Sequence, residues 1–199
     1  MDDHYFSADP TVAFKRVPVV AEVWGHDLAM TSGSGVFAVG RLDVGTAVLF
    51  RETEPPTGRR FLDLGCGYGV IGLALATTVG EAVVRGVDVN ERAVLLANEN
   101  AASLGVGDRF VAATPEQVPH DEIYDEIWSN PPIRVGKAVL HALLAAWLPR
   151  LAPGGVAHLV VQRNLGSDSL QRWVETELAM PCTRLASSKG FRVLEVRRA

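Results

Sequence analysis

Three glycines at alternate positions follow a short apolar run and an aspartate in the segment Phe61-Leu62-Asp63-Leu64-Gly65-Cys66-Gly67-Tyr68-Gly69. A helical pattern of apolar residues begins directly afterwards, at Val70. Glycine allows a tight turn and lets a ligand approach the main chain, where a Cβ atom would clash. The segment therefore predicts the strand, turn and helix that open a nucleotide-binding α/β unit.

Two classes of ligand suit this loop. Gly67 to Gly72 matches the dinucleotide fingerprint, and Asp88 follows at the end of a second predicted strand. A dinucleotide loop faces a pyrophosphate, which the carboxylate of Asp63 would repel. The ammonium group of S-adenosylmethionine suits that carboxylate, and Asp88 can accept hydrogen bonds from ribose hydroxyls in either cofactor. We favour S-adenosylmethionine, with NAD or a flavin as the alternative and a turn without ligand as the third interpretation.

The second chemical motif is Asn130-Pro131-Pro132, placed after a predicted fourth strand of the sheet. An exocyclic amine on a base is a poor nucleophile because its lone pair is delocalised into the ring. An Asn side-chain oxygen and the carbonyl of Pro131 can each accept a hydrogen bond from one N–H of such an amine. The lone pair of the amine nitrogen is then directed at the methyl group of S-adenosylmethionine. Two consecutive prolines keep this backbone rigid. By itself the tripeptide is also compatible with a structural turn.

Together these motifs carry a family resemblance. Asp63 to Gly69 resembles motif I of class I methyltransferases, and Asn130-Pro131-Pro132-Ile133 resembles motif IV of amino-group methyltransferases. With Gly35-Val36-Phe37 and Leu42-Asp43-Val44-Gly45-Thr46 upstream, the chain resembles the methyltransferase small domain family from about Val17 to its end. Within that family it resembles the catalytic half of the ribosomal RNA guanine-N2 methyltransferases. The resemblance implies an S-adenosylmethionine-dependent N-methyltransferase with RNA as partner, acting on guanine N2 of ribosomal RNA of the 16S type.

The resemblance also implies roles for individual residues. The catalytic group comprises Asn130, Pro131, Pro132 and Ile133. The cofactor is expected to contact Asp63, Gly65, Cys66, Gly67, Gly69, Asp88, Val89, Thr114 and Asn130, with Thr114 or a backbone group beside it holding the adenine. The substrate is expected to contact Phe37, Arg134, Gln162 and Lys189. Ile133 departs from the aromatic residue usual in the family, so stacking on a base is less specific there.

Other functions remain open at this point. A protein glutamine amide or a small molecule is the alternative acceptor, because Asn-Pro-Pro also occurs in glutamine methyltransferases and the net charge of −4 does not favour a broad RNA surface. A nicotinamide-dependent oxidoreductase that uses Gly67, Gly69 and Gly72 is a remote alternative that gives Asn-Pro-Pro no role. A non-catalytic cofactor-binding module is another.

The predicted elements form an α/β domain of the Rossmann-like kind. Strands are expected at 60–64, 82–88, 108–112, 124–129 and 156–162, and helices at 70–79, 91–104, 136–150 and 168–178, with Asn90 and Ser167 as N-caps. Strands at 182–187 and 191–197 are expected to form an antiparallel hairpin. The result is a mostly parallel seven-stranded sheet with an antiparallel last strand and helices on both faces. Residues 1–58 are expected to form a hairpin and a short helix that Asp43 caps, packed on the methyltransferase domain at 59–199, so that the protein is effectively one domain.

The composition is that of a soluble globular protein, with 199 residues, 48% hydrophobic and 21% charged. The longest apolar run, 138–148, is shorter than the ~20 residues that span a membrane. The acidic start of the chain does not resemble a secretory signal, and the two cysteines lack metal-ligand spacing. We therefore expect a cytoplasmic, monomeric protein without a metal site or a membrane partner.

Overall fold

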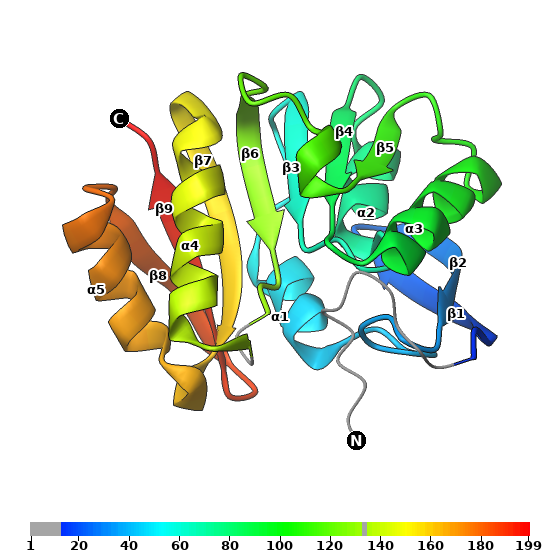
Figure 1. The fold of residues 1–199 in the computed structure, drawn as a ribbon, viewed down its shortest axis with the longest axis horizontal. Helices are drawn as coiled ribbons and strands as arrows, with labels where there is room; N and C mark the ends of the chain where they lie inside the picture. Colours follow the sequence, from blue (N-terminus) through cyan, green and yellow to red (C-terminus); the bar gives the residue numbers. More distant parts are fainter. Residues whose placement is uncertain (1–12, 133–134) are drawn as a thin grey trace.

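The computed structural model describes residues 13–132 and 135–199. A seven-stranded sheet has the order β5-β4-β3-β6-β7-β9-β8 (Figure 1). Its strands are β3 (Arg60–Leu64), β4 (Val83–Val87), β5 (Phe110–Ala113), β6 (Tyr124–Ser129), β7 (Leu151–Gln162), β8 (Cys182–Ser188) and β9 (Phe191–Arg197). Neighbouring strands pair in parallel except at β9, which is antiparallel to both β7 and β8. The predicted Rossmann-like sheet with its reversed last strand is confirmed.

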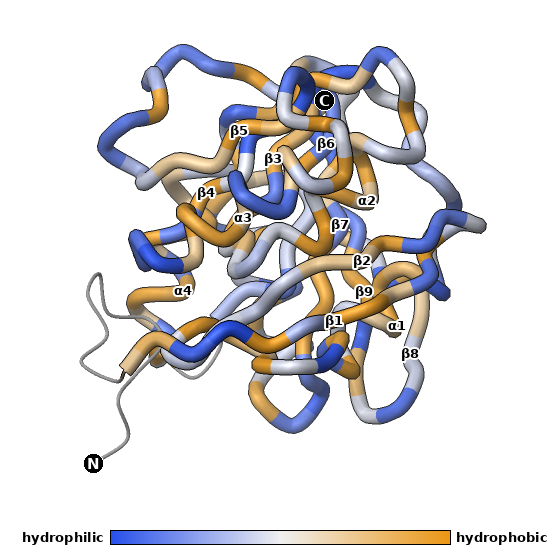
Figure 2. Tube along the Cα trace, turned by 90° about the vertical axis from the view of Figure 1, so that its right-hand side faces the viewer, coloured by the Kyte–Doolittle hydropathy of each residue, from blue (hydrophilic) through white to orange (hydrophobic). Residues whose placement is uncertain are grey.

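Two hydrophobic cores lie on opposite faces of this sheet, because successive side chains of a strand point to opposite sides. Phe61 and Trp128 belong to the core formed with α1 (Val44–Glu52), α2 (Val70–Thr78) and α3 (Glu91–Ser103). Their strand neighbours Leu62 and Ile127 belong to the core formed with α4 (Lys137–Trp147) and α5 (Ser167–Glu177). Figure 2 shows hydrophobic colour along the central strands and hydrophilic colour in many of the outer loops.

The N-terminal hairpin packs against α2 and α3. Its strands β1 (Arg16–Val23) and β2 (His26–Gly33) pair antiparallel, and the alternate residues Val19, Ala21 and Val23 are buried. Asn100 of α3 accepts a hydrogen bond from Thr31 N at 2.8 Å and donates one to Thr31 O at 2.9 Å. The same amide donates to Tyr68 O at 2.9 Å, so one buried side chain links the hairpin to the glycine loop.

Two boundaries differ from the prediction by more than two residues. The helix expected at 136–150 ends at Trp147 and continues as a 3-10 turn, Leu148–Arg150, because Pro149 has no N–H to donate to a longer α-helix. Strand β7 begins at Leu151 instead of 156, and a register shift in its pairing with β6 accommodates the Pro153-Gly154-Gly155 segment.

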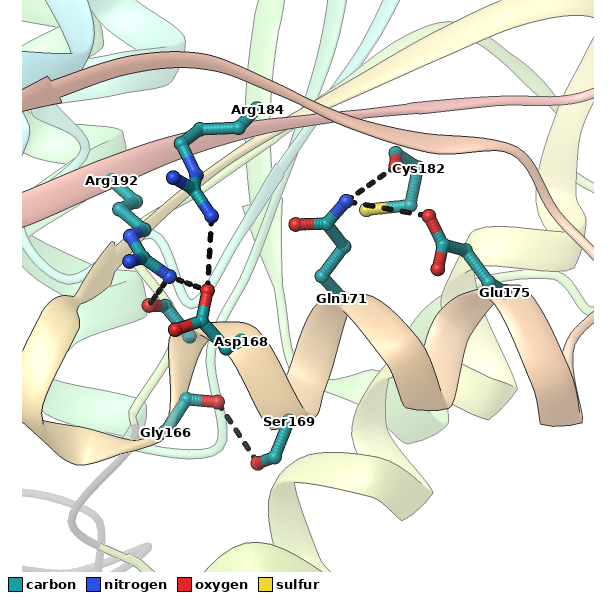
Figure 3. A network of polar contacts seen from close by, with 9 residues as sticks. Gly166, Asp168, Ser169, Gln171, Glu175, Cys182, Arg184 and Arg192 are labelled. Carbon is teal, nitrogen blue, oxygen red and sulfur yellow. Dashed lines mark hydrogen bonds and ion pairs between the residues drawn. The ribbon is translucent and has the colours of Figure 1, made fainter.

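The cap of α5 also differs from the prediction, since Gly166 holds the N-cap position and Ser167 is the first helical residue. Ser167 instead accepts a hydrogen bond from Arg192 Nη1 of β9 at 3.1 Å. Asp168 forms ion pairs with Arg192 and with Arg184 of β8. Figure 3 shows both arginines converging on this carboxylate at the start of α5. These contacts hold α5 against the last hairpin, whose Phe191 lines the pocket described below.

Within the described residues, no helix is long and apolar enough to cross a membrane.

Candidate active site

A pocket of about 790 Å³ lies at the carboxyl edge of the parallel strands, where open α/β sheets bind their ligands. Figure 1 shows α1 close to the carboxyl end of β6 at this edge. The walls come from the segment before and within α1, the glycine loop, the carboxyl ends of β4, β5 and β6, the helix α4, and the β7–β9 side. Its lining includes Val36, Phe37, Ala38, Arg41, Asp43, Gly65, Asp88, Val89, Pro115, Asn130, Pro131, Pro132, Leu143, Gln162, Leu165 and Phe191.

The glycine loop is held by the end of the neighbouring strand. Gly65 N and Cys66 N both donate to Val87 O, at 2.8 and 3.0 Å. Gly65, Gly67 and Gly69 have φ angles of +74°, +54° and +94°, a region that side chains with a Cβ atom rarely adopt. Cys66 is buried beneath the loop, and burial raises the pKa of its thiol. Of the three glycines, Gly65 lines the pocket, while Gly67 and Gly69 shape the turn and the start of α2.

Asp88 lies at the carboxyl end of β4 beside this loop. Its Oδ2 accepts a hydrogen bond from Gly67 N at 2.9 Å, and its Oδ1 accepts one from Asn90 N at 2.9 Å. Burial raises the pKa of Asp88, and these backbone hydrogen bonds act in the opposite direction. Val89, which follows it, leaves 43% of its surface exposed at the pocket. The pair thus offers a fixed acceptor beside an apolar surface, an arrangement suited to a nucleoside.

Asp63 differs from the expectation of a direct ligand contact. Its side chain has no exposed surface and does not belong to the pocket lining. Oδ2 accepts a hydrogen bond from Gly72 N in the first turn of α2 at 2.7 Å, whereas Oδ1 has no partner among the described residues. Desolvation, with a smaller effect from Asp88, raises the pKa of Asp63 to about 7. Asp63 therefore anchors the helix beneath the loop, and it meets no ligand directly in this conformation.

Asn130, Pro131 and Pro132 follow β6 and line the same pocket beside the glycine loop. A Cβ atom built on Gly65 would lie 3.9 Å from Pro132 Cδ, so the two predicted motifs come close together. The amide of Asn130 donates from Nδ2 to Asp43 Oδ2 at 2.8 Å and to Thr46 Oγ1 at 3.0 Å. Asp43 also caps α1, as predicted from the sequence.

The remaining predicted site residues divide into three groups. Phe37 and Gln162 line the pocket. Thr114 and Lys189 do not: Thr114 opens a 3-10 turn beside it, and Lys189 is an exposed residue of the β8–β9 turn. The neighbouring Pro115 reaches the pocket where Thr114 was expected to. Ile133 and Arg134 lie outside the described residues.

The sequence interpretation missed lining residues that come from α1 and β9. Phe191 was not among the predicted site residues, and Asp43 was predicted only as a helix cap. A local signal for Asp43 existed, since Leu42 to Thr46 was part of the family resemblance. Phe191 had none, because its place depends on the antiparallel pairing of β9 with β7.

Among the described residues, no group of three or more His, Cys, Asp and Glu side chains is arranged to hold a metal ion.

Comparison with known proteins agrees with this geometry. Residues 27–195 match the family model for the methyltransferase small domain. An uncharacterized protein of Bacillus subtilis, YbxB, is 33% identical over the full length of both chains. A ribosomal RNA large subunit methyltransferase G of Shewanella is 31% identical over 92% of this chain, which covers 51% of that protein.

A solved structure gives the spatial comparison. The N2 methyltransferase of 16S rRNA from T. thermophilus, in complex with AdoMet and guanosine, superposes with a TM-score of 0.81 at 26% identity. The match covers 96% of this chain and 53% of that one. The chain thus spans about half the length of the two rRNA methyltransferases and the whole of the Bacillus protein.

These matches disfavour the oxidoreductase alternative, and the predicted enzyme class, a methyltransferase, is confirmed. The chain belongs to the methyltransferase small domain family.

Proposed function

We propose that this protein is an S-adenosylmethionine-dependent N-methyltransferase that acts on guanine N2 of ribosomal RNA. The observation that carries the proposal is the approach of Asn130-Pro131-Pro132 to the glycine loop across one pocket. A methyl-donor site and an amine-binding motif are needed within a few ångströms of one another, because transfer requires the nitrogen, the methyl carbon and the sulfur in line.

The residues of the loop side fit the cofactor. Gly65 lines the pocket, and a Cβ atom built on it would have only Pro132 Cδ within 4 Å, at 3.9 Å, so the turn leaves space for a ligand against the main chain. Asp88 offers carboxylate oxygens for the ribose hydroxyls, and Val89 and Pro115 offer apolar surface for the adenine. A volume of about 790 Å³ can hold a nucleoside cofactor together with a base. S-adenosylmethionine, when bound, supplies an electrophilic methyl group on a sulfonium.

The residues of the opposite side would orient the acceptor. In this proposal Asn130 Oδ1 and the carbonyl of Pro131 each accept one N–H of the exocyclic amine, which turns its lone pair toward the methyl group. The rings of Pro131 and Pro132 keep the backbone from rearranging. No strong base is required, since the proton can leave after transfer. Phe37 and Phe191 are the aromatic residues of the pocket against which a flat base could pack.

The substrate class in this proposal comes from the relatives. Ribosomal RNA as substrate is inferred from the names of two similar proteins, one a 16S rRNA N2 methyltransferase and the other a large-subunit enzyme. Because these two relatives act on different ribosomal subunits, the experiment below determines which subunit carries the methylated rRNA. An RNA substrate also predicts a cytoplasmic enzyme.

The cofactor is tested by calorimetric titration with S-adenosylhomocysteine beside NAD on the same sample. Micromolar binding of the first and no binding of the second is expected. The reverse result would discard the methyltransferase interpretation of the pocket.

The acceptor is tested by incubation with tritiated S-adenosylmethionine and four substrates: small subunits, large subunits, deproteinised rRNA and total cell protein. Nucleosides from the labelled RNA are then identified by mass spectrometry. We expect N2-methylguanosine in one rRNA. Label in protein alone would contradict the proposal in favour of a glutamine amide, and label on another nucleoside would contradict guanine N2.

A further inference from the structure

Two residues far away in the sequence hold the side-chain amide of Asn130 by hydrogen bonds, an arrangement called the grip below. Its Nδ2 lies 2.8 Å from Asp43 Oδ2 and 3.0 Å from Thr46 Oγ1. These two acceptors belong to the N-cap and the first turn of α1. Both hydrogens of the amide thus have a partner, and neither partner belongs to the βα units that carry the family's two motifs.

The two acceptors decide which end of the amide faces the pocket. A carboxamide has nearly the same shape after rotation by half a turn, so packing alone does not choose between its oxygen and its nitrogen. A carboxylate only accepts hydrogen bonds, whereas a hydroxyl both donates and accepts. Asp43 therefore fixes the NH2 end of the Asn130 amide toward α1. The Thr46 hydroxyl then acts as the second acceptor for this NH2 group. The oxygen then points away from Asp43.

The grip is itself rigid. Asp43 Oδ2 also accepts hydrogen bonds from Gly45 N at 2.7 Å and from Thr46 N at 3.1 Å. Thr46 is 3% exposed, so its hydroxyl has little freedom to move. A Cβ atom on Gly45 would lie 2.9 Å from the ring of Phe191, so β9 closes the first turn of α1 from the other side. A supporting shell fixed in this way holds a reacting group to within a fraction of an ångström.

We infer that Asp43 and Thr46 are positioning residues that hold the oxygen of Asn130 toward the acceptor amine and its NH2 away from it. The inference rests on the proposed function for its consequence, because an amide turned the other way would present donors to an amine that also donates. It also assigns the N-terminal segment a part in turnover in addition to packing. The geometry of the grip itself can be tested without any substrate.

The first experiment observes the Asn130 amide directly. In 15N-labelled protein, its NH2 signals are assigned by their absence in Asn130→Ala. Asp43→Ser keeps a residue that caps a helix about as well as Asp, but its oxygen lies one bond closer to the backbone. Thr46→Val removes the hydroxyl and keeps the shape. We expect an upfield shift of one NH2 proton and faster exchange with water in each variant. Unchanged signals in both variants would overturn the inference, whatever the activity.

The second experiment measures methyl transfer with the rRNA identified above. We expect kcat to fall about 30-fold in Asp43→Ser and about tenfold in Thr46→Val, while KM and the affinity for S-adenosylhomocysteine stay within about threefold. Thr46→Ser, which restores the hydroxyl, should recover most of the loss. Introduced into Asn130→Ala, neither substitution should lower kcat further, because residues that act through one group are not additive. Additive losses would show that the two act on stability or on another group, and would overturn the inference.

A matched control removes a hydroxyl from the other end of the same helix. Thr53 Oγ1 donates to Leu49 O at 2.7 Å and does not line the pocket. Thr53→Val should leave kcat and the Asn130 signals unchanged. Equal loss in Thr53→Val would overturn the inference, because any weakening of α1 would then suffice. Failure of Asn130→Ala to lower turnover would instead reject the proposed role of Asn130, while the amide signals still test the grip.

Discussion

The two sides of the pocket are built in different ways. The cofactor side is local: Gly67 N and the Asp88 carboxylate, joined at 2.9 Å, are 21 residues apart in one βαβ unit. The acceptor side is assembled over distance, since Asn130 meets Asp43 and Thr46 across 87 and 84 residues. The first depends on backbone atoms and glycine conformations, and the second on side chains from separate elements. The proposed cofactor site therefore depends on one local motif, whereas the proposed acceptor site depends on the packing of the whole fold.

This contrast predicts that the two sides can be damaged separately. The largest effect is expected on the acceptor side. Asn130→Ala removes the oxygen that would orient the amine, so kcat should fall by about 10³-fold, or about 4 kcal/mol. The affinity for S-adenosylhomocysteine, measured by calorimetry, should change less than about threefold. A parallel loss of cofactor affinity would contradict this contrast, because the two sides would then not be separable.

The next effect concerns the pH dependence of stability beneath the loop. Burial raises the pKa of Asp63 to about 7 in the folded protein, from an ordinary value of 3.8. Between these two values the unfolded chain has lost its proton while the folded protein keeps it. The free energy of unfolding should therefore fall by about 3 kcal/mol as pH rises from about 4 to about 7, and level off above.

Urea titrations of the wild type and of Asp63→Asn, from pH 4 to pH 8, isolate this contribution. Asp88, whose pKa is also raised, contributes with the same sign and is present in both proteins. The difference between the two curves should therefore grow with pH and level off near pH 7. Parallel curves would mean that Asp63 is ionised throughout this range.

A smaller effect is expected from the acceptor oxygens of the cofactor side. Asp88→Ala removes the carboxylate proposed to hold the ribose and also frees Gly67 N. We expect the dissociation constant of S-adenosylhomocysteine to rise about 30-fold, or about 2 kcal/mol. At saturating cofactor, kcat should stay within about threefold. Asp108→Ala is the control, since its carboxylate is mostly exposed.

The smallest effect tests the apolar surface beside Asp88. Val89→Ala removes two methyl groups from a residue that is 43% exposed and that the adenine would cover. Affinity for S-adenosylhomocysteine should fall about fivefold, or about 1 kcal/mol, with little change in stability. Val83→Ala is the matched control, an exposed valine at the opposite end of β4. Equal losses in both variants would place the adenine elsewhere.

The sequence by itself determined the sheet, the glycine loop and the two motifs, because these depend on local patterns. The strands at 60–64, 124–129 and 191–197 have their predicted bounds, since strand periodicity and turn residues fix them within a few positions. The caps Asp43 and Asn90 were predicted for the same reason: a cap acts on the N–H groups two and three residues ahead of it.

Tertiary structure decided how deeply the predicted site residues are buried and which residues from distant elements contact them. Burial beneath the loop turned Asp63 from an expected ligand contact into an anchor for α2, and no local pattern encodes how deep a strand end lies. The pairing of β9 with β7 brought Phe191 to the pocket. The packing of α1 against the sheet placed Asp43 beside Asn130. Contacts between residues more than 80 apart depend on how layers pack, which a single sequence does not specify by periodicity or spacing.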